Sequence, residues 1–183
     1  TKLFCGYNPL TELDVSRNTK LTELLCHENQ LTALDLTHNT ALATVYCPNN
    51  RLTALDLSKN TALATLACSR NQLTALDLSQ NTAITELYCN NNQLAALDLS
   101  RNTALTELYC NGNRLTTLDL SRNTELTKIY CDDNPLTELN ISNLSKIEEI
   151  VFGDNPEINV IANSQTVVSD EVRHYMDGKR KTP

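Results

Sequence analysis

Cysteine is the residue type in this chain that can take part in the most kinds of chemistry, and it recurs at one fixed interval. Successive cysteines are 21 residues apart, without insertion or deletion, at Cys5, Cys26, Cys47, Cys68, Cys89, Cys110 and Cys131. Thiols can form disulfides, bind metal ions or act as nucleophiles. A fixed period of this length indicates a repeat array, so the geometry of the repeat decides which of these uses is open.

A straight file of equivalent thiols suits none of the three uses. In stacked parallel strands, equivalent side chains lie about 4.8 Å apart and point the same way, whereas a disulfide joins Cβ atoms about 3.8 Å apart with converging vectors. Zinc sites usually show C-x-x-C or paired Cys and His, and the sequence has no such spacing. The nearest base, His27, follows Cys26 and points to the opposite face of a strand. We therefore predict free, buried thiols, with no metal, cofactor or catalytic residue.

The repeat unit places these cysteines in the core. Aligned on cysteine, it reads L-x-x-L-x-C-x-x-N-x-L-x-x-L-D-L-S-x-N-T-x. Apolar residues alternate in each half and an asparagine ends each run, which predicts short strands and leaves no room for a helix. The unit is one coil of a β-rich solenoid with two corners. Because a thiol is smaller than a leucine side chain, we expect a narrower core behind the cysteine strand.

Asparagine marks both corners of the coil. The first file follows the cysteine strand and comprises Asn8, Asn29, Asn50, Asn71, Asn92, Asn113, Asn134 and Asn155. The second comprises Asn18, Asn39, Asn60, Asn81, Asn102 and Asn123. Corners leave backbone groups unpaired, and an amide side chain offers two donor hydrogens and an acceptor. We expect these residues to be structural and to satisfy the backbone inside the turns.

The repeat resembles the leucine-rich repeat, in particular that of bacterial surface proteins of the internalin type, and among these the cysteine-ladder (internalin J-like) arrays. The resemblance covers residues 1 to about 160, in seven in-phase copies. It implies a right-handed leucine-rich-repeat solenoid with a parallel sheet on the concave face, formed by the L-x-x-L-x-C halves. It also implies an extracellular or bacterial cell-surface location. Such motifs specify a scaffold and not a ligand.

The pattern predicts two regions in the chain. Residues 1–155 form the repeat array, with about seven and a half coils, and residues 156–183 form a C-terminal cap. The cap is expected to contain a short helix near 169–177, because a serine and an aspartate precede this segment and a glycine follows it. Terminal coils need their open core covered.

The array changes at both ends. Near its C-terminal end Asn140 replaces the aspartate, Leu144 replaces the second asparagine and Phe152 stands in the cysteine position. A larger ring in that position suits a closing layer. The first residues already belong to a repeat, so we expect the parent chain to begin before Thr1.

Aspartate forms a third file, on the outer side of the second half-coil. Its members are Asp14, Asp35, Asp56, Asp77, Asp98 and Asp119, each followed two residues later by a serine or a threonine. We expect these carboxylates to accept hydrogen bonds from nearby hydroxyl or backbone groups, with basic residues offsetting part of the charge. Calcium is the alternative, although it needs six to eight oxygens around one point.

Rows that vary between copies are better candidates for function than rows that repeat. The outward positions beside the cysteines contain tyrosines, acids and amides, and the candidate concave patch comprises Tyr46, Tyr88, Tyr109, Tyr130, Glu86, Glu107, Asn90, Asn111 and Asp132. Tyrosine is enriched at interfaces because it combines a large area with a polar tip. The alternative is that the aromatic rings simply pair along parallel strands.

Charge and composition narrow the function. A formal net charge of -7 argues against a nucleic-acid partner, and no apolar run approaches the roughly 18 residues of a membrane span. Three histidines on unrelated surfaces and only four glycines provide no catalytic or phosphate-binding motif. We predict a non-catalytic binding module for a protein or glycan ligand, with adhesion implied by the resemblance. The alternatives are a structural spacer and a consensus-derived array.

Overall fold

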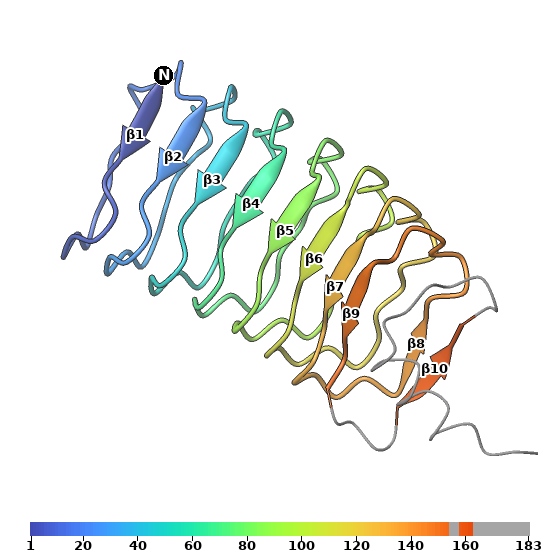
Figure 1. Ribbon diagram of the computed structural model, residues 1–183. Helices are drawn as coiled ribbons and strands as arrows, with labels where there is room; N and C mark the ends of the chain where they lie inside the picture. Colours follow the sequence, from blue (N-terminus) through green and yellow to red (C-terminus); the bar gives the residue numbers. More distant parts are fainter. Residues whose placement is uncertain (154–157, 163–183) are drawn as a thin grey trace, which may run out of the picture.

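The computed structural model describes residues 1–153 and 158–162. The chain winds in successive coils, most of which add one three-residue strand to a single sheet (Figure 1). The strands of this main sheet are β1 (Lys2–Phe4), β2 (Glu23–Leu25), β3 (Thr44–Tyr46), β4 (Thr65–Ala67), β5 (Glu86–Tyr88), β6 (Glu107–Tyr109), β7 (Lys128–Tyr130) and β9 (Glu149–Val151). A second sheet pairs β8 (Glu138–Asn140) with β10 (Asn159–Ile161). No helix that could cross a membrane is present in the described ranges.

The eight strands of the main sheet are parallel and pair in chain order. Each strand is offset from the next by one repeat, so that Ala67 pairs with Tyr88. The middle residue of a strand points inward and its neighbours face outward, because side chains alternate along a strand. In β5, Leu87 is fully buried, whereas Glu86 and Tyr88 are half-buried. The predicted parallel β-solenoid with 21-residue coils is confirmed.

Leucine rows and the cysteine ladder fill the core. The cysteines from Cys26 to Cys131 are free thiols with at most 1% of their surface exposed, whereas Cys5 in the first coil is partly exposed. Each cysteine continues the hydrogen bonding of its strand, as the Cys89 N–H does by donating to the Tyr109 carbonyl at 2.8 Å. Burial raises the pKa of the Cys89 thiol to about 12. The buried thiols are therefore protonated at neutral pH and are poor nucleophiles.

The first asparagine file ties each coil to the one before it. Asn92 Nδ2 donates to the Cys89 carbonyl of its own coil at 3.0 Å and to the Cys68 carbonyl of the preceding coil at 3.1 Å. Asn92 Oδ1 accepts from the Leu73 N–H at 3.0 Å. The same three bonds recur at Asn29, Asn50, Asn71, Asn113 and Asn134. One amide thus satisfies backbone groups that the corner would otherwise leave unpaired.

The second asparagine file makes fewer bonds. Asn81 Nδ2 donates to the carbonyls of Asn60 at 2.9 Å and Leu57 at 3.0 Å. Its Oδ1 is buried without a hydrogen-bond partner among the described residues, and so are the equivalent oxygens of Asn39, Asn60, Asn102 and Asn123. Leu144 occupies this position in a later coil and is 1% exposed. An apolar side chain is therefore compatible with the second corner.

The turn after each of the strands β1 to β7 contains one residue in the left-handed region. The backbone φ lies between 52° and 65° at Tyr7, Glu28, Asn49, Arg70, Asn91, Gly112 and Asp133. Glycine adopts this conformation without steric penalty, and asparagine or aspartate tolerates it better than other residues. The repeat pattern does not reveal this row, because its residue types differ from coil to coil.

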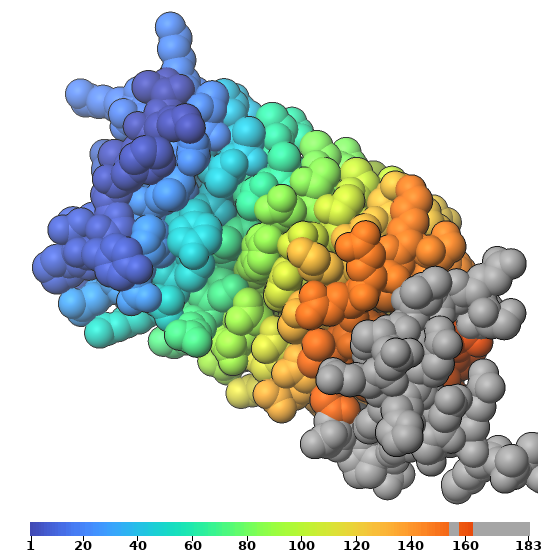
Figure 2. Space-filling view, in the orientation of Figure 1, coloured from blue at the N-terminus to red at the C-terminus, as the bar shows by residue number. Residues whose placement is uncertain are grey.

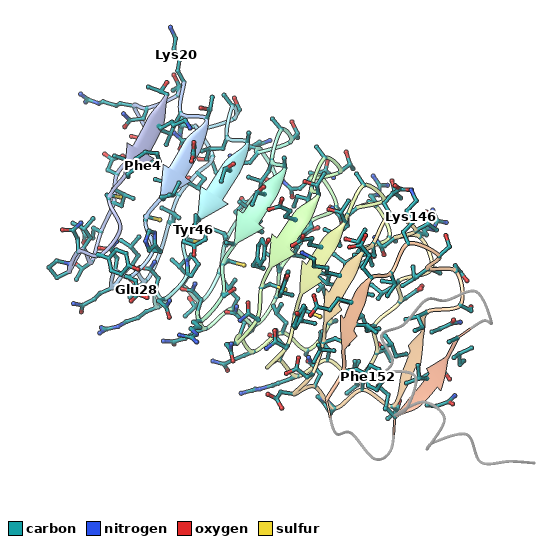
Figure 3. All side chains as sticks on the ribbon, viewed as in Figure 1. Phe4, Lys20, Glu28, Tyr46, Lys146 and Phe152 are labelled. Atoms are coloured by element: carbon teal, nitrogen blue, oxygen red, sulfur yellow. The ribbon has the colours of Figure 1, made fainter. Side chains whose placement is uncertain are left out.

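Residues 158–162, which lie in the segment predicted as a C-terminal cap, pack against the repeat array. Strand β10 pairs in parallel with β8, which lies one repeat earlier, and Ile158 is buried in the core. Residues 158–162 therefore extend the second side of the coil. Phe152, labelled in Figure 3, stands in the cysteine position and is 6% exposed. The cap helix expected near 169–177 lies outside the described residues.

Candidate ligand-binding face

The outward side chains of the main sheet form one continuous surface from coil to coil (Figure 2). Tyr88, Tyr109 and Tyr130 are the last residues of β5, β6 and β7, and they are register partners across the sheet. We call these three residues the tyrosine stack. The structure brings together the central part of the patch predicted from the sequence.

The rings of the tyrosine stack lie face to face. The centroids of Tyr88 and Tyr109 are 4.7 Å apart with planes inclined by 21°, and those of Tyr109 and Tyr130 are 4.6 Å apart with planes inclined by 13°. These spacings match the distance between neighbouring strands, about 4.8 Å. The strand register therefore sets the stacking. Each inner ring face is covered by the next ring, which leaves the ring edges, the outer face of Tyr88 and the outer face of Tyr130 for other contacts.

Acidic residues fix the hydroxyl ends of the tyrosine stack. Tyr88 donates its hydroxyl hydrogen to Glu107 Oε2 at 3.1 Å, and Tyr130 donates to Glu149. The other Glu107 oxygen, Oε1, accepts from Lys128 Nζ at 3.0 Å. Burial, followed by the charges of nearby glutamates, raises the pKa of Tyr88. The hydrogen bond to Glu149 raises the pKa of Tyr130 to about 12, so both hydroxyls stay protonated at neutral pH.

The remaining predicted patch residues flank the tyrosine stack. Glu86 and Glu107 are register partners in β5 and β6, and Asn90, Asn111 and Asp132 form the row just after the cysteines. Asn90 Oδ1 accepts from the Ser69 hydroxyl at 2.5 Å. Burial raises the pKa of the Asp132 carboxyl. The face is acidic around its tyrosines, and Lys128 lies among these acidic residues, paired with Glu107.

Tyr46 stands apart from the tyrosine stack, because Ala67 occupies the strand between Tyr46 and Tyr88. Figure 3 shows Tyr46 at the end of β3. Its ring meets His27 edge to face, with centroids 5.0 Å apart, and His27 meets Tyr7 in the same way at 4.8 Å. The structure therefore divides the predicted patch into two aromatic groups, and His27 belongs to the group nearer the N-terminus.

A cavity of about 220 Å³ lies where the aromatic row is interrupted. Ala67 is one of its lining residues and is 2% exposed. The walls include Tyr46 and Pro48 on one side and Tyr88 on the other, with Arg70 also lining it. Reasoning from sequence missed this feature, although the signal was present in the row of outward residues, where alanine replaces an aromatic ring.

The aspartate file does not contribute to this face. Asp77 Oδ1 accepts from the N–H of Ser79 at 2.9 Å, and the equivalent bond forms at Asp14, Asp35, Asp56, Asp98 and Asp119. These bonds lower the pKa of the Asp77 carboxyl. Within the described ranges, no three Asp, Glu, His or Cys side chains converge as a metal site would require. Each aspartate carboxylate accepts a hydrogen bond from the backbone of its own turn.

Solved structures of bacterial leucine-rich-repeat proteins are similar to this chain. The functional domain of InlJ from Listeria monocytogenes, which includes a cysteine ladder, is 36% identical, and the match covers 91% of this chain and 44% of that domain with a TM-score of 0.73. YopM, a leucine-rich effector protein from Yersinia pestis, is 27% identical, with 85% and 43% covered and a TM-score of 0.70. The internalin InlF of Listeria monocytogenes, at 24% identity and with 84% and 48% covered, shares the fold with a TM-score of 0.78.

The chain spans less than half the length of each of these three structures. No protein-family model and no curated protein matches the sequence. The leucine-rich-repeat solenoid predicted from the sequence is confirmed, and so is the resemblance of its repeats to the cysteine-ladder arrays.

Proposed function

Taking the chain as a leucine-rich-repeat solenoid of the internalin type with a cysteine ladder, we propose that it is a non-catalytic module that binds a protein through the face of its main sheet. The observation that supports this function is the tyrosine stack, which presents ring edges and fixed hydroxyls on an otherwise polar surface. Rigid aromatic side chains contribute large contact area with little loss of conformational entropy on binding.

The charge of the face indicates the kind of partner. Glu86, Glu107, Glu149 and Asp132 surround the tyrosines, and Lys128 is already paired with Glu107. An acidic face favours a partner with a neutral or basic surface, because opposite charges speed association and like charges repel. A protein partner is therefore our proposal, and a glycan is the alternative. A bacterial surface or secreted location, and a role in adhesion, belong to the same proposal.

A structural spacer is the second candidate function. One observation favours it: the hydroxyls of Tyr88 and Tyr130 already have acceptors within the chain, and the three rings already stack on one another. Such contacts stabilise a solenoid without any ligand. In that case the repeats would hold another domain away from the cell.

Removal of the tyrosine stack distinguishes the two functions. The parent protein is screened for capture of extracellular proteins and glycans, and the captured ligand is titrated against the triple variant Tyr88→Ser, Tyr109→Ser and Tyr130→Ser. The matched control changes three exposed threonines of the second half-coil, Thr53, Thr74 and Thr116, to serine. We expect the tyrosine variant to bind at least about tenfold more weakly and the control to bind like the parent. Equal affinity in both variants would favour the spacer.

A further inference from the structure

The aromatic row on the sheet face lacks one ring. The last residues of consecutive strands are Tyr46, Ala67, Tyr88, Tyr109 and Tyr130. Where rings occupy adjacent strands of the stack, their centroids lie 4.6 to 4.7 Å apart. Tyr46 and Tyr88 are separated by two strand spacings, about 10 Å. The strand register therefore leaves one position of the aromatic row without a ring, at Ala67.

The side chains around this position line a partly open cavity. Its volume is about 220 Å³, and its lining residues include Ala67, which the surrounding side chains cover to 2% exposure. Tyr46, Pro48 and Tyr88 present carbon-rich walls. The face of the Tyr88 ring that does not contact Tyr109 is the natural stacking surface, since Tyr109 covers the other one. We call this cavity the Ala67 slot.

From this geometry we propose that the Ala67 slot receives one aromatic side chain of the protein partner, stacked on Tyr88 in line with the existing tyrosines. The proposal rests on the proposed function of the face and specifies its central contact. The inserted ring would continue the stack at the same spacing. Arg70 lines the slot, where its guanidinium group can lie against an inserted ring.

A sugar ring suits the slot less well. A pyranose has several hydroxyl groups that need hydrogen-bond partners when they are buried. The Ser69 hydroxyl already donates to Asn90 Oδ1, which leaves Asn49 and Arg70 as the other polar lining residues. The rest of the lining comes from Tyr46, Pro48, Ala67 and Tyr88. The face of an aromatic ring requires no hydrogen-bond partner, and a tyrosine or tryptophan side chain has only one polar group to satisfy, so the lining favours an aromatic side chain over a glycan.

Saturation-transfer NMR with N-acetyl-tryptophanamide tests the slot directly. The chain contains no tryptophan, so indole signals come from the probe alone. The variant Ala67→Tyr fills the slot with the ring that neighbouring strands carry, and Tyr88→Ser removes the stacking surface while it enlarges the space. The control, Val151→Tyr, adds a tyrosine to the same row beyond Tyr130, at the far end of the sheet.

We expect saturation transfer to the indole in the parent and in Val151→Tyr, and at least a fivefold loss in the two slot variants. Transfer that is absent in the parent, or equal in all variants, overturns the proposal. Transfer to methyl glucoside in place of the indole also overturns it and identifies a sugar slot.

The ligand captured by the sheet face provides the second measurement. We expect Ala67→Tyr to weaken its binding at least tenfold while the tyrosine stack stays intact. Unchanged affinity in Ala67→Tyr, together with weak binding in the triple serine variant, would show that the sheet face binds the ligand without using the Ala67 slot. The two proposals therefore fail separately.

Discussion

The side-chain oxygen of Asn92 accepts a hydrogen bond at 3.0 Å from the backbone N–H of Leu73, a residue of the preceding coil. The same amide donates to two carbonyl oxygens, one in each coil. Every such asparagine therefore connects neighbouring coils, and the repeated file links the array along its length. The second file lacks the accepting bond, because its Oδ1 atoms have no partner in the described part of the chain.

This difference predicts unequal effects of the same substitution at the two corners. Asn92→Ala leaves the Leu73 N–H without its acceptor, while the Cys68 and Cys89 carbonyls each lose one of two asparagine donors. It should lower the free energy of unfolding by about 2 to 4 kcal/mol. Asn81→Ala removes two donated bonds but also an unpaired oxygen, and should lower it by about 1 to 2 kcal/mol. Urea unfolding of both variants measures the difference. Equal losses would contradict the assigned bonding.

Because Cys89 is fully buried, we predict that the core has no room for a larger side chain in the cysteine row. Cys89→Leu should overpack the space behind the sheet and lower the free energy of unfolding by about 1 to 3 kcal/mol. The urea midpoint in reducing buffer provides the measurement. A variant as stable as the parent would show that the core is not narrow at the cysteine ladder.

The cysteine ladder also predicts a steep loss of stability in alkali. Burial raises the pKa of Cys89 and Cys131 from 9.0 to about 12. Above pH 9 the unfolded thiols ionise while the folded ones keep their protons, so the unfolded state binds fewer protons and the free energy of unfolding falls. The part of the stability that depends on protonated thiols is fully present below pH 9 and is lost as the pH rises toward about 12.

The buried thiols set the slope of this pH dependence near pH 9, and above pH 10 the tyrosine stack adds to it, because the pKa values of Tyr88 and Tyr130 are also raised. Each buried thiol contributes about 1.4 kcal/mol per pH unit, so the free energy of unfolding, measured by urea melts from pH 8 to pH 11, should fall by several kcal/mol per pH unit. Cys89→Ala should make that slope less steep by about 1.4 kcal/mol per pH unit, which is the contribution of one thiol. An unchanged slope in Cys89→Ala would mean that this thiol does not ionise differently in the two states.

Backbone conformation predicts opposite effects of glycine substitutions in the turn row. At Gly112, where φ is 65°, an added Cβ would lie 2.6 Å from Asn91 Oδ1, so Gly112→Ala should lower the free energy of unfolding by about 1 to 2 kcal/mol. Glu28 has φ of 53°, and Glu28→Gly should raise stability by up to about 1 kcal/mol. Thermal melts compare the two. Destabilisation by Glu28→Gly would show that the left-handed conformation carries little strain there.

The aspartate file predicts no response to calcium, because each carboxylate already caps its own turn. Melting temperatures in about 1 mM calcium and in EDTA should agree. Binding with a dissociation constant near 0.1 mM would stabilise the fold by about 1.4 kcal/mol and raise the melting temperature by about 3 to 5 °C. A shift of that size would indicate that the aspartate file binds calcium.

Much of the fold could be predicted because the repeat makes local information sufficient. Alternation along a strand places Leu87 inside and Tyr88 outside, and the constant period then places every equivalent residue in the same row. The candidate site was predicted only in outline. The sequence indicated one outward patch, whereas the structure holds a tyrosine stack and a separate group around His27.

The sequence by itself therefore determined the rows: which side chains face the core, which mark the corners and which face outward. Only the tertiary structure decided how members of a row meet. Contact across coils depends on strand spacing and on the size of each neighbour, so Tyr88 stacks on Tyr109 but faces a cavity above Ala67. For the same reason the amides at the two corners, identical in sequence, differ in their bonds. The backbone groups within reach of each oxygen are set by the path of the neighbouring coil.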